Sequence, residues 1–530
     1  MSAARVSRGS VRYALCIACC CATVASVSAQ SPPAAVQLHE GRPQTASQST
    51  EDRFRYDVDI GAGTYVVRLE QRGLDLKLAV ESPGGATETH DSPTLRDGEE
   101  IAVLTGPGRY RVDVYSDEST DARGGHAIAL VNASNAAANE LEAWRLAGAG
   151  AAANFAGGEE GWSKAADAYA RAAELWHGLG RTREEADALF AAATVQYRQL
   201  VAWQTAAEQA ARAAALYEQL GDAALAANAL HLQGASLVEQ ALEVRQSAEA
   251  DAPLAAESEE LFGEALRLLE QARATHERLG RLYDLGKVVN NFGYTYFSRG
   301  EFARARPYYE QAAALFASAG EWGAQVQPLA NAAVLDAEAG RLASAIATFE
   351  QMLKIMPPGK LLARRSVTLE NLGATQLLRG DAEIALRTFA DALALYRVRE
   401  DEHGESRALR RIGEAYYTLG ELDLAEQYLR QALPLAERTN EARTQEAALR
   451  NLGNVAFLRR DYAAALELHR RALESSASLS DRAYLQVLVT KDLVALGRAA
   501  EARAAAGEAR AFAQSSGSER LLAAADAAVG

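Results

Sequence analysis

Four asparagines recur in this 530-residue chain at positions where their side chains could bind another polypeptide. Each stands two residues before a small residue of a repeated helical pattern, so it lies beside the apolar stripe of its helix. An amide both donates and accepts hydrogen bonds, as an extended peptide backbone does. These residues are Asn291, Asn331, Asn371 and Asn451, and Arg411 stands at the equivalent position of one further repeat.

Cationic and amide side chains lie near these asparagines at helical spacing. Steps of three, four or seven residues place on one expected side Arg407, Arg410, Arg411, Arg450, Asn454 and Lys491. Guanidinium groups pair well with carboxylates, so one hypothesis is a groove that accepts an acidic or C-terminal peptide segment. The alternative is that the asparagines tie adjacent helices together, and that the arginines pair with Glu370, Glu414 and Glu446.

The sequence contains no set of residues typical of catalysis, metal binding or cofactor binding. The eight histidines form no HxxxH or HxxEH pair, and no phosphate-binding glycine loop follows an expected strand. We therefore predict a protein that is not an enzyme and has no cofactor. The acids Asp91, Asp97, Glu99 and Glu100 could bind calcium, but a solvated loop is the commoner origin of such a group.

Residues 1–29 have the features of a Sec signal peptide. Three arginines precede an apolar stretch, and Val27-Ser28-Ala29 fits signal-peptidase cleavage, so we expect a periplasmic or secreted protein. The alternative is a lipoprotein anchored through Cys19. All four cysteines lie within this segment, so cleavage after Ala29 would leave no thiol. The net charge of -15 argues against binding to nucleic acid, and no later segment is apolar enough to span a membrane.

The segment after the signal changes character twice. Residues 30–50 are rich in Pro, Ser, Gln and Ala and are expected to be a flexible linker. Residues 51–132 alternate apolar and polar side chains, which predicts six short strands in an antiparallel β-sandwich. Turns are expected at Gly61-Ala62-Gly63 and at residues 105–108, where glycines interrupt the alternation.

Residues 140–515 show a helical repeat with a period of 40 residues in its central copies. The small residues that mark these copies are Gly293, Ala333, Gly373, Gly413 and Gly453. A turn residue follows each marker after seven positions and an alanine after twelve. One helical hairpin cannot bury both of its apolar faces, so the pattern predicts a stack of about nine hairpins, an α-solenoid. We expect an insertion near residues 243–258 and a tail at 516–530.

The order of small, aromatic, glycine and alanine residues in these units resembles tetratricopeptide repeats. The resemblance implies a mainly α-helical fold, a right-handed superhelix whose first helices line a concave surface. It also implies that asparagines at the marked positions bind peptides. The segments "YVVRLEQRGLDLKLAVESPGG" and "GPGRYRVDVYS" resemble the pre-peptidase C-terminal type of sandwich.

A signal peptide, a small sandwich and long repeats in this order resemble the N-terminal part of secreted bacterial CHAT-domain proteins. No caspase-like protease segment follows the repeats in this sequence. The implied function is a non-catalytic exported scaffold that binds a protein or peptide. One alternative is a fragment or degenerate relative of a CHAT-type protease, and another is a cell-surface adhesion protein whose sandwich binds glycan.

Overall fold

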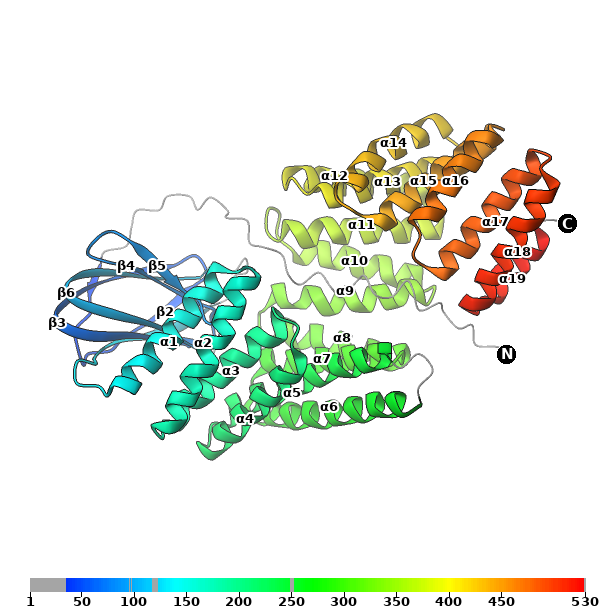
Figure 1. Cartoon of the computed structure of the whole chain (residues 1–530). Helices are drawn as coiled ribbons and strands as arrows, with labels where there is room; N and C mark the ends of the chain where they lie inside the picture. The colour runs from blue at the N-terminus through cyan, green and yellow to red at the C-terminus, as the bar shows by residue number, and fades with distance from the viewer. Residues whose placement is uncertain (1–34, 95, 97, 117–122, 248–251, 529–530) are drawn as a thin grey trace. The chain divides into compact units, whose positions relative to one another are not determined.

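The computed structural model describes residues 35–94, 96, 98–116, 123–247 and 252–528 (Figure 1). These residues form a seven-stranded, mainly antiparallel sheet followed by an α-solenoid, and nineteen helices lie within the described ranges. The chain divides into two compact units, one within Ser26–Pro328 and one within Leu329–Gly530. The expected signal peptide, with Cys19, lies outside the described residues.

The strands follow one another before the first helix. They are β1 (Val36–Gln37), β2 (Gln44–Ser49), β3 (Arg53–Arg72), β4 (Lys77–Glu81), β5 (Thr87–His90), β6 (Glu99–Tyr115) and β7 (Arg123–Asn132). Their order across the sheet is β2-β7-β3-β6-β4-β5, and β1 pairs with β3 in parallel. Side chains from both ends of the long strands, such as Val58 and Leu69, belong to one buried core. The sheet therefore folds over, so that the two halves of β3 and β6 pack around one core as a small sandwich.

The two glycine-rich segments that we expected to be turns lie inside long strands, so that prediction is wrong. β3 and β6 stay paired through both segments, and the register shifts between Ile60 and Gly63. A Cβ atom on Gly106 would lie 2.3 Å from the backbone oxygen of Gly61, so glycine is needed for close approach of the two strands. A local irregularity of this kind bends a sheet without reversing its strands.

The prediction of a flexible linker at residues 30–50 is wrong for its described part. β2 pairs along its whole length with β7, and β1 pairs with β3. The strand Gln44–Ser49 is polar because it lies at the edge of the sheet, where only some of its side chains are buried. Its stability comes mainly from backbone hydrogen bonds, which composition does not reveal.

The helices form consecutive antiparallel hairpins. In the first unit they are α1 (Ala138–Ala156), α2 (Gly158–Gly178), α3 (Thr182–Arg198), α4 (Trp203–Gln219), α5 (Ala223–Ser247), α6 (Ala252–Leu279), α7 (Leu282–Ser298) and α8 (Phe302–Ser318). The helix α9 (Trp322–Glu338) crosses the division between the units. The second unit continues with α10 (Leu342–Ile355), α11 (Leu362–Arg379), α12 (Ala382–Val398), α13 (Glu402–Leu419), α14 (Leu422–Arg438), α15 (Ala442–Leu458), α16 (Tyr462–Ser475), α17 (Leu479–Ala495) and α18 (Ala499–Ser516).

The small marker residues let the two helices of a hairpin approach each other. A Cβ atom on Gly293 would lie 2.8 Å from the ring of Tyr309, sixteen residues later. The same contact recurs between Gly373 and Phe389 at 2.6 Å, and in two later hairpins. Each bulky side chain therefore fills the space that a missing side chain leaves on the opposite helix.

The expected insertion and the expected C-terminal tail both contain helix. Near residues 243–258 the insertion lengthens α5 and α6, and Phe262 packs against Ala241 close to the end of this hairpin. At the C-terminus the expected tail contains a further helix, α19 (Glu519–Ala527), whose Ala525 packs against Ala509 and Val487. At the C-terminus the short alanine-rich segment did not distinguish a packed helix from a tail.

Most turns between the helices of a hairpin contain a residue with positive φ, and Val201 is strained there. Glycine occupies this place at Gly300, with φ of 80°, whereas Val201 has φ of 56°. A β-branched residue is strongly disfavoured in this region. We expect Val201→Gly to raise the free energy of unfolding by about 1 kcal/mol, because relief of the strain exceeds the added entropy of the unfolded chain.

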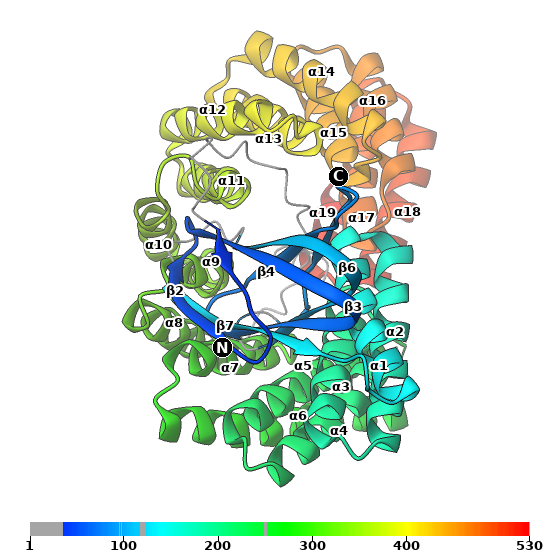
Figure 2. The ribbon, with the colours of Figure 1, turned by 90° about the vertical axis from the view of Figure 1, so that its left-hand side faces the viewer.

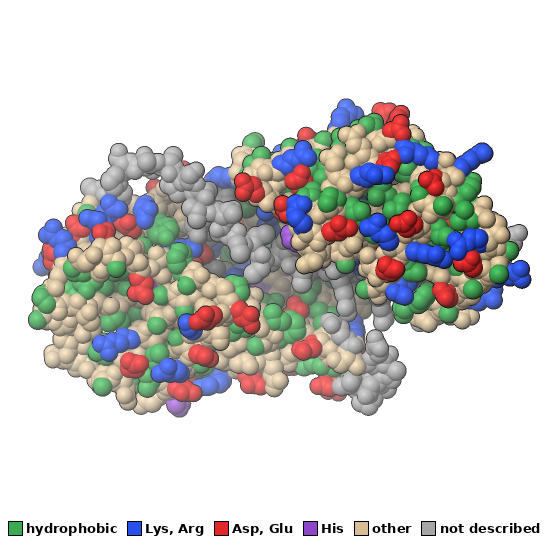
Figure 3. All heavy atoms as spheres, turned by 45° about the horizontal axis from the view of Figure 1, so that its top comes forward, with side chains coloured by type: hydrophobic (Ala, Val, Ile, Leu, Met, Phe, Trp, Pro, Cys, Tyr) green, Lys and Arg blue, Asp and Glu red, His purple; other side chains and the backbone are tan. Residues whose placement is uncertain are grey.

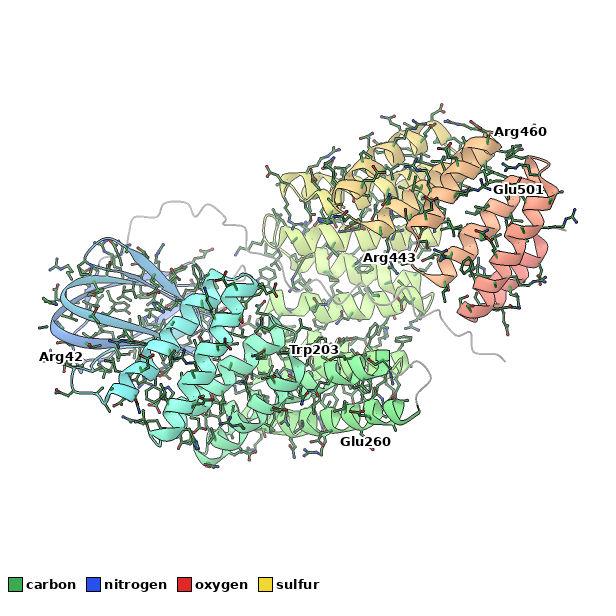
Figure 4. All side chains as sticks on the ribbon, viewed as in Figure 1. Arg42, Trp203, Glu260, Arg443, Arg460 and Glu501 are labelled. Atoms are coloured by element: carbon green, nitrogen blue, oxygen red, sulfur yellow. The ribbon has the colours of Figure 1, made fainter. Side chains whose placement is uncertain are left out.

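Thermal unfolding of the full chain measures this change. Val201 is 55% exposed, so its side chain contributes little packing that could be lost. Gly300→Val is the matched control and should lower stability by a similar amount. A lower melting temperature for Val201→Gly would contradict the prediction. Arg460, at the turn between α15 and α16 (Figure 4), has φ of 63° and offers a second, milder test.

Candidate functional site

The predicted binding residues lie on the odd-numbered helices of the solenoid. Asn291 lies on α7 in the first unit, and Asn331 lies on α9. The others occupy α11, α13, α15 and α17 of the second unit; they are Asn371, Arg407, Arg410, Arg411, Arg450, Asn451, Asn454 and Lys491. We call this last set, together with Glu414, the odd-helix face.

Carboxylates of the same unit pair with the four arginines of the odd-helix face. Arg407 lies 3.3 Å from Glu370 on α11 and 3.1 Å from Glu441, next to the start of α15. Its guanidinium group is thus held between two neighbouring hairpins. The other arginines pair along their own helices: Arg410 to Glu414 at 2.9 Å, Arg411 to Glu414 at 3.1 Å, and Arg450 to Glu446 at 3.4 Å. These pairs are the ones that the packing alternative predicts.

Burial and crowding alter the ionisation of this face. Burial lowers the pKa of Arg410 to about 10, and the charge of Arg411 acts in the same direction. Burial would raise the pKa of Glu414, but the nearby arginines outweigh it and lower that pKa. Burial raises the pKa of Glu446, and Arg450 opposes this shift only in part. At neutral pH the face therefore carries charges of both signs held close together.

The asparagines differ in what they contact. The side-chain amide of Asn291 lies 2.8 Å from Nε2 of His231 on α5, so it ties two odd-numbered helices together. Asn331 is buried. Asn451 is only 6% exposed, and its Nδ2 has no hydrogen-bond partner among the described residues. Asn371 and Asn454 are half-buried, so the asparagine series does not form one uniform column.

Three buried polar atoms on α13 and α15 lack hydrogen bonds within the described part of the chain. They are Nε of Arg411, Nδ2 of Asn451 and Oε1 of Glu446, and this last atom has only the 3.4 Å ion-pair contact with Arg450. Two of them are donors and the third is an acceptor. Buried polar groups of folded proteins are nearly always hydrogen-bonded, so such atoms mark a place where a ligand or water completes the set. The sequence predicts Glu446 only as an ion-pair partner, because burial of a helical glutamate has no signal in the sequence.

The acids considered for calcium have other partners. Arg68 pairs with Glu99 at 2.8 Å, and Lys77 pairs with Asp91 at 2.9 Å. Glu100 is fully buried and accepts hydrogen bonds from the backbone of Ser92, so it does not lie in a solvated loop. Burial raises its pKa well above the usual value. Asp97 lies outside the described residues, and within them no group of His, Cys, Asp and Glu suited to a metal ion occurs.

The contact between Asn291 and His231 leads to a prediction about pH. Burial lowers the pKa of His231 from 6.5 to about 3, and Lys287 acts in the same direction. The neutral ring can therefore accept a hydrogen bond from Asn291. Below pH 6.5 the unfolded chain takes up a proton at this histidine while the folded chain does not, so acid destabilises the fold.

We expect the free energy of unfolding to fall by about 2 kcal/mol between pH 7 and pH 5, because His231 is protonated in the unfolded chain alone. Denaturant unfolding at a series of pH values measures this loss, and His231→Gln should make the dependence on pH shallower. His39→Gln, which changes an exposed histidine, should leave that dependence as it is. An unchanged slope in His231→Gln would contradict the assignment.

None of the helices in the described ranges combines the length and the hydropathy needed to cross a membrane.

Comparison with known families identifies the repeats. Residues 284–357, 364–438 and 447–480 match models of the tetratricopeptide repeat. The chain thus contains tetratricopeptide repeats, as the order of small and aromatic residues indicates. These models concern the repeats alone, and no curated protein matches this chain.

Several solved structures are similar in fold. One is the signal transduction ATPase with a tetratricopeptide repeat sensor from Pyrococcus horikoshii, which is 12% identical with a TM-score of 0.46, over 67% of this chain and 53% of that one. BtubC from P. vanneervenii is 17% identical with a TM-score of 0.36, over 40% and 88%. The Rap conjugation gene regulator of plasmid pLS20, in complex with the Phr* peptide, is 15% identical with a TM-score of 0.37, over 55% and 78%.

Proposed function

We propose that this protein is a non-catalytic scaffold whose odd-helix face binds an extended peptide segment of a partner protein. Stacked helical repeats present long surfaces, and such proteins use these surfaces for binding. The observation that carries the proposal is that these three buried atoms of α13 and α15 lack hydrogen bonds to other described residues. An extended main chain offers both the acceptors that Arg411 and Asn451 require and the donor that Glu446 requires.

The ion pairs of the face argue for recognition of the peptide backbone and against a strongly acidic partner. Each arginine of the face already has a carboxylate nearby, so an incoming acid would have to displace it. Acidic and basic residues are nearly balanced over 329–530, and Figure 3 shows them interspersed on the surface. Lys491 is exposed and has no ion-pair partner in the described chain, so a single acid could bind at α17.

Peptides selected from a random display library on the full chain provide the probe for this proposal. Asn451→Ala and Arg411→Ala should each weaken binding of the selected peptides about tenfold, with little change in melting temperature. Arg430→Ala is the matched control, because Arg430 is exposed on the even-numbered helix α14. The affinity should vary little with salt, since few net charges are neutralised on binding.

The packing alternative predicts a different outcome. If Asn451 and Arg411 serve only to hold helices together, their replacement lowers the melting temperature and leaves peptide affinity unchanged. Methylation of the peptide's backbone nitrogens distinguishes recognition of the peptide's main chain from recognition of its side chains, because it removes main-chain donors without altering side chains. Undiminished affinity after methylation would refute backbone recognition.

Export forms part of the same proposal and depends on residues 1–29. The cationic start, apolar stretch and small residues before Gln30 support secretion through Sec. Fractionation of cells that express the full chain, followed by mass spectrometry of its N-terminus, tests this. A new N-terminus at Gln30 in the periplasm or medium is expected, whereas a lipid-modified Cys19 would identify the lipoprotein alternative. An uncleaved chain in the cytoplasm would refute export.

The CHAT-type relationship remains a second proposal, drawn from the order of signal, sandwich and repeats. It requires a His and Cys protease segment encoded with this one. Sequencing of the DNA that follows the codon for Gly530 tests it directly. A stop codon there, with no such segment nearby, would leave the scaffold proposal alone.

A further inference from the structure

The sheet of the first unit is attached firmly to the first odd-numbered helix. The backbone oxygen of Gly148 on α1 lies 3.0 Å from Nδ1 of His90, and the side chain of Asn154 donates to the backbone oxygen of Asp91 at 2.8 Å. The guanidinium group of Arg68 lies 4.9 Å from the ring of Trp144. These contacts anchor one end of the sheet, along β5 and β6, on α1 (Figure 1).

A second attachment joins the same region of the sheet to helices much later in the chain. Arg96, between β5 and β6, pairs with Glu321 at 2.6 Å and 3.2 Å in a bidentate contact. The Arg96 guanidinium also lies 4.4 Å from the ring centroid of Tyr283 on α7. The side chains of Arg96 and Glu321 are only 11% and 12% exposed. A bidentate pair that is largely removed from water is stronger than an ordinary surface pair.

The sheet therefore contacts the first odd-numbered helix, α1, and Arg96, between β5 and β6, reaches the fourth hairpin at α7. Burial raises the pKa of Asp187 on α3, and the charge of Glu99 on β6 acts in the same direction. Figure 2, which looks onto the sheet, shows it in front of the arc that α1 to α8 form. In this unit the odd-numbered helices carry Lys287, Asn291 and His231, polar groups of the kind found on the odd-helix face.

We propose that the sandwich occupies the odd-numbered helices of residues 138–298 as an intramolecular ligand, and that Arg96 fastens it there. A partner that binds this surface must first release the Arg96 contact with Glu321 and Tyr283. Lys287 reports on this state, because its ammonium group, which pairs with Asp284 at 2.9 Å, also lies 5.2 Å from the centroid of the same Tyr283 ring. All of these contacts lie within residues 35–328, so this inference does not depend on the proposed peptide site at residues 362–495.

Charge reversal in the full chain tests the fastening. Arg96→Glu places two carboxylates together, so the sheet should detach from α7 while its contacts with α1 hold it in the fold. The rate at which acetic anhydride modifies Lys287, followed by mass spectrometry, should rise about threefold or more, as in other local openings. Lys164, which is exposed on α2, serves as the internal control and should react at an unchanged rate.

The double variant Arg96→Glu/Glu321→Arg restores an ion pair of opposite polarity. It should return the reactivity of Lys287 toward that of the original protein. Hydrogen exchange of the amides at 282–288 should likewise be fastest in Arg96→Glu and slower in the original protein and the double variant. An unchanged rate at Lys287 in Arg96→Glu would overturn the proposal. Equal increases at Lys164 and Lys287 would also overturn it, because they would show that the contact maintains the whole unit.

Discussion

Replacing His469 by phenylalanine is expected to lower the free energy of unfolding by about 3–5 kcal/mol, because it leaves Asp492 buried without its partner. The Nδ1 atom of His469 on α16 lies 2.6 Å from Oδ2 of Asp492 on α17. Their side chains are 1% and 0% exposed. Phenylalanine fits the space, since Phe349 and Phe389 occupy the same place in other hairpins. The lost free energy of unfolding therefore measures the effect on the Asp492 carboxylate and not a misfit of the new side chain.

The double variant His469→Phe/Asp492→Val is the control that separates these effects. Valine occurs at the equivalent position of α15, Val455, where it is buried. Removing both polar partners should restore stability to within about 1 kcal/mol of the original protein. Urea unfolding, with hydrogen exchange of α16 and α17 as the local measure, gives both values. A single variant as stable as the original would show that the pair contributes nothing.

Trp144→Ala is expected to have the second large effect, about 3–5 kcal/mol, and to act on the sheet and the helices together. Trp144 packs edge-on against Trp176 of α2, with their ring centroids 4.7 Å apart. Both rings share one buried cluster with Val66 of β3 and Ala133 just after β7. Because this core crosses from sheet to solenoid, the two parts should unfold cooperatively.

Hydrogen exchange with mass spectrometry follows both parts in one experiment. In Trp144→Ala, amides of β3 and β6 should exchange faster together with those of α1 and α2. Trp203→Ala is the matched control, since Trp203 is half-buried at the start of α4 (Figure 4) and its loss should affect only neighbouring turns. Faster exchange in α1 and α2 alone would contradict a shared core.

The repeated hairpins were predictable because their determinants are local. A glycine and a bulky residue sixteen positions later both belong to one hairpin, and their recurrence shows that they pack. The pairs of Arg410 with Glu414 and Arg450 with Glu446 are four residues apart on one helix, so helical geometry brings them together. Arg407 is different, because its partner Glu370 lies on a neighbouring hairpin.

The sheet and the candidate site could be predicted from the sequence only in part. The alternation in residues 51–132 predicted strands, but a break at glycine fits a turn or a close approach equally well, and only pairing between β3 and β6 decides which. His469 occupies a position that elsewhere holds an aromatic or aliphatic residue, and nothing near it in sequence identifies Asp492 as its partner. The atoms of Arg411, Glu446 and Asn451 that lack hydrogen bonds among the described residues are buried by adjacent helices, and the sequence does not reveal that burial.

By itself, the sequence determined that this chain builds a small sandwich and a solenoid of helical hairpins. Its period, its small residues and its alternating apolar side chains act over one turn, one strand or one hairpin. Only the tertiary structure decided that Arg407 forms an ion pair with Glu370, that Asn291 contacts His231, and that Arg96 reaches Glu321. Those contacts join residues up to 225 positions apart, and their energies depend on which side chains the packed helices remove from water.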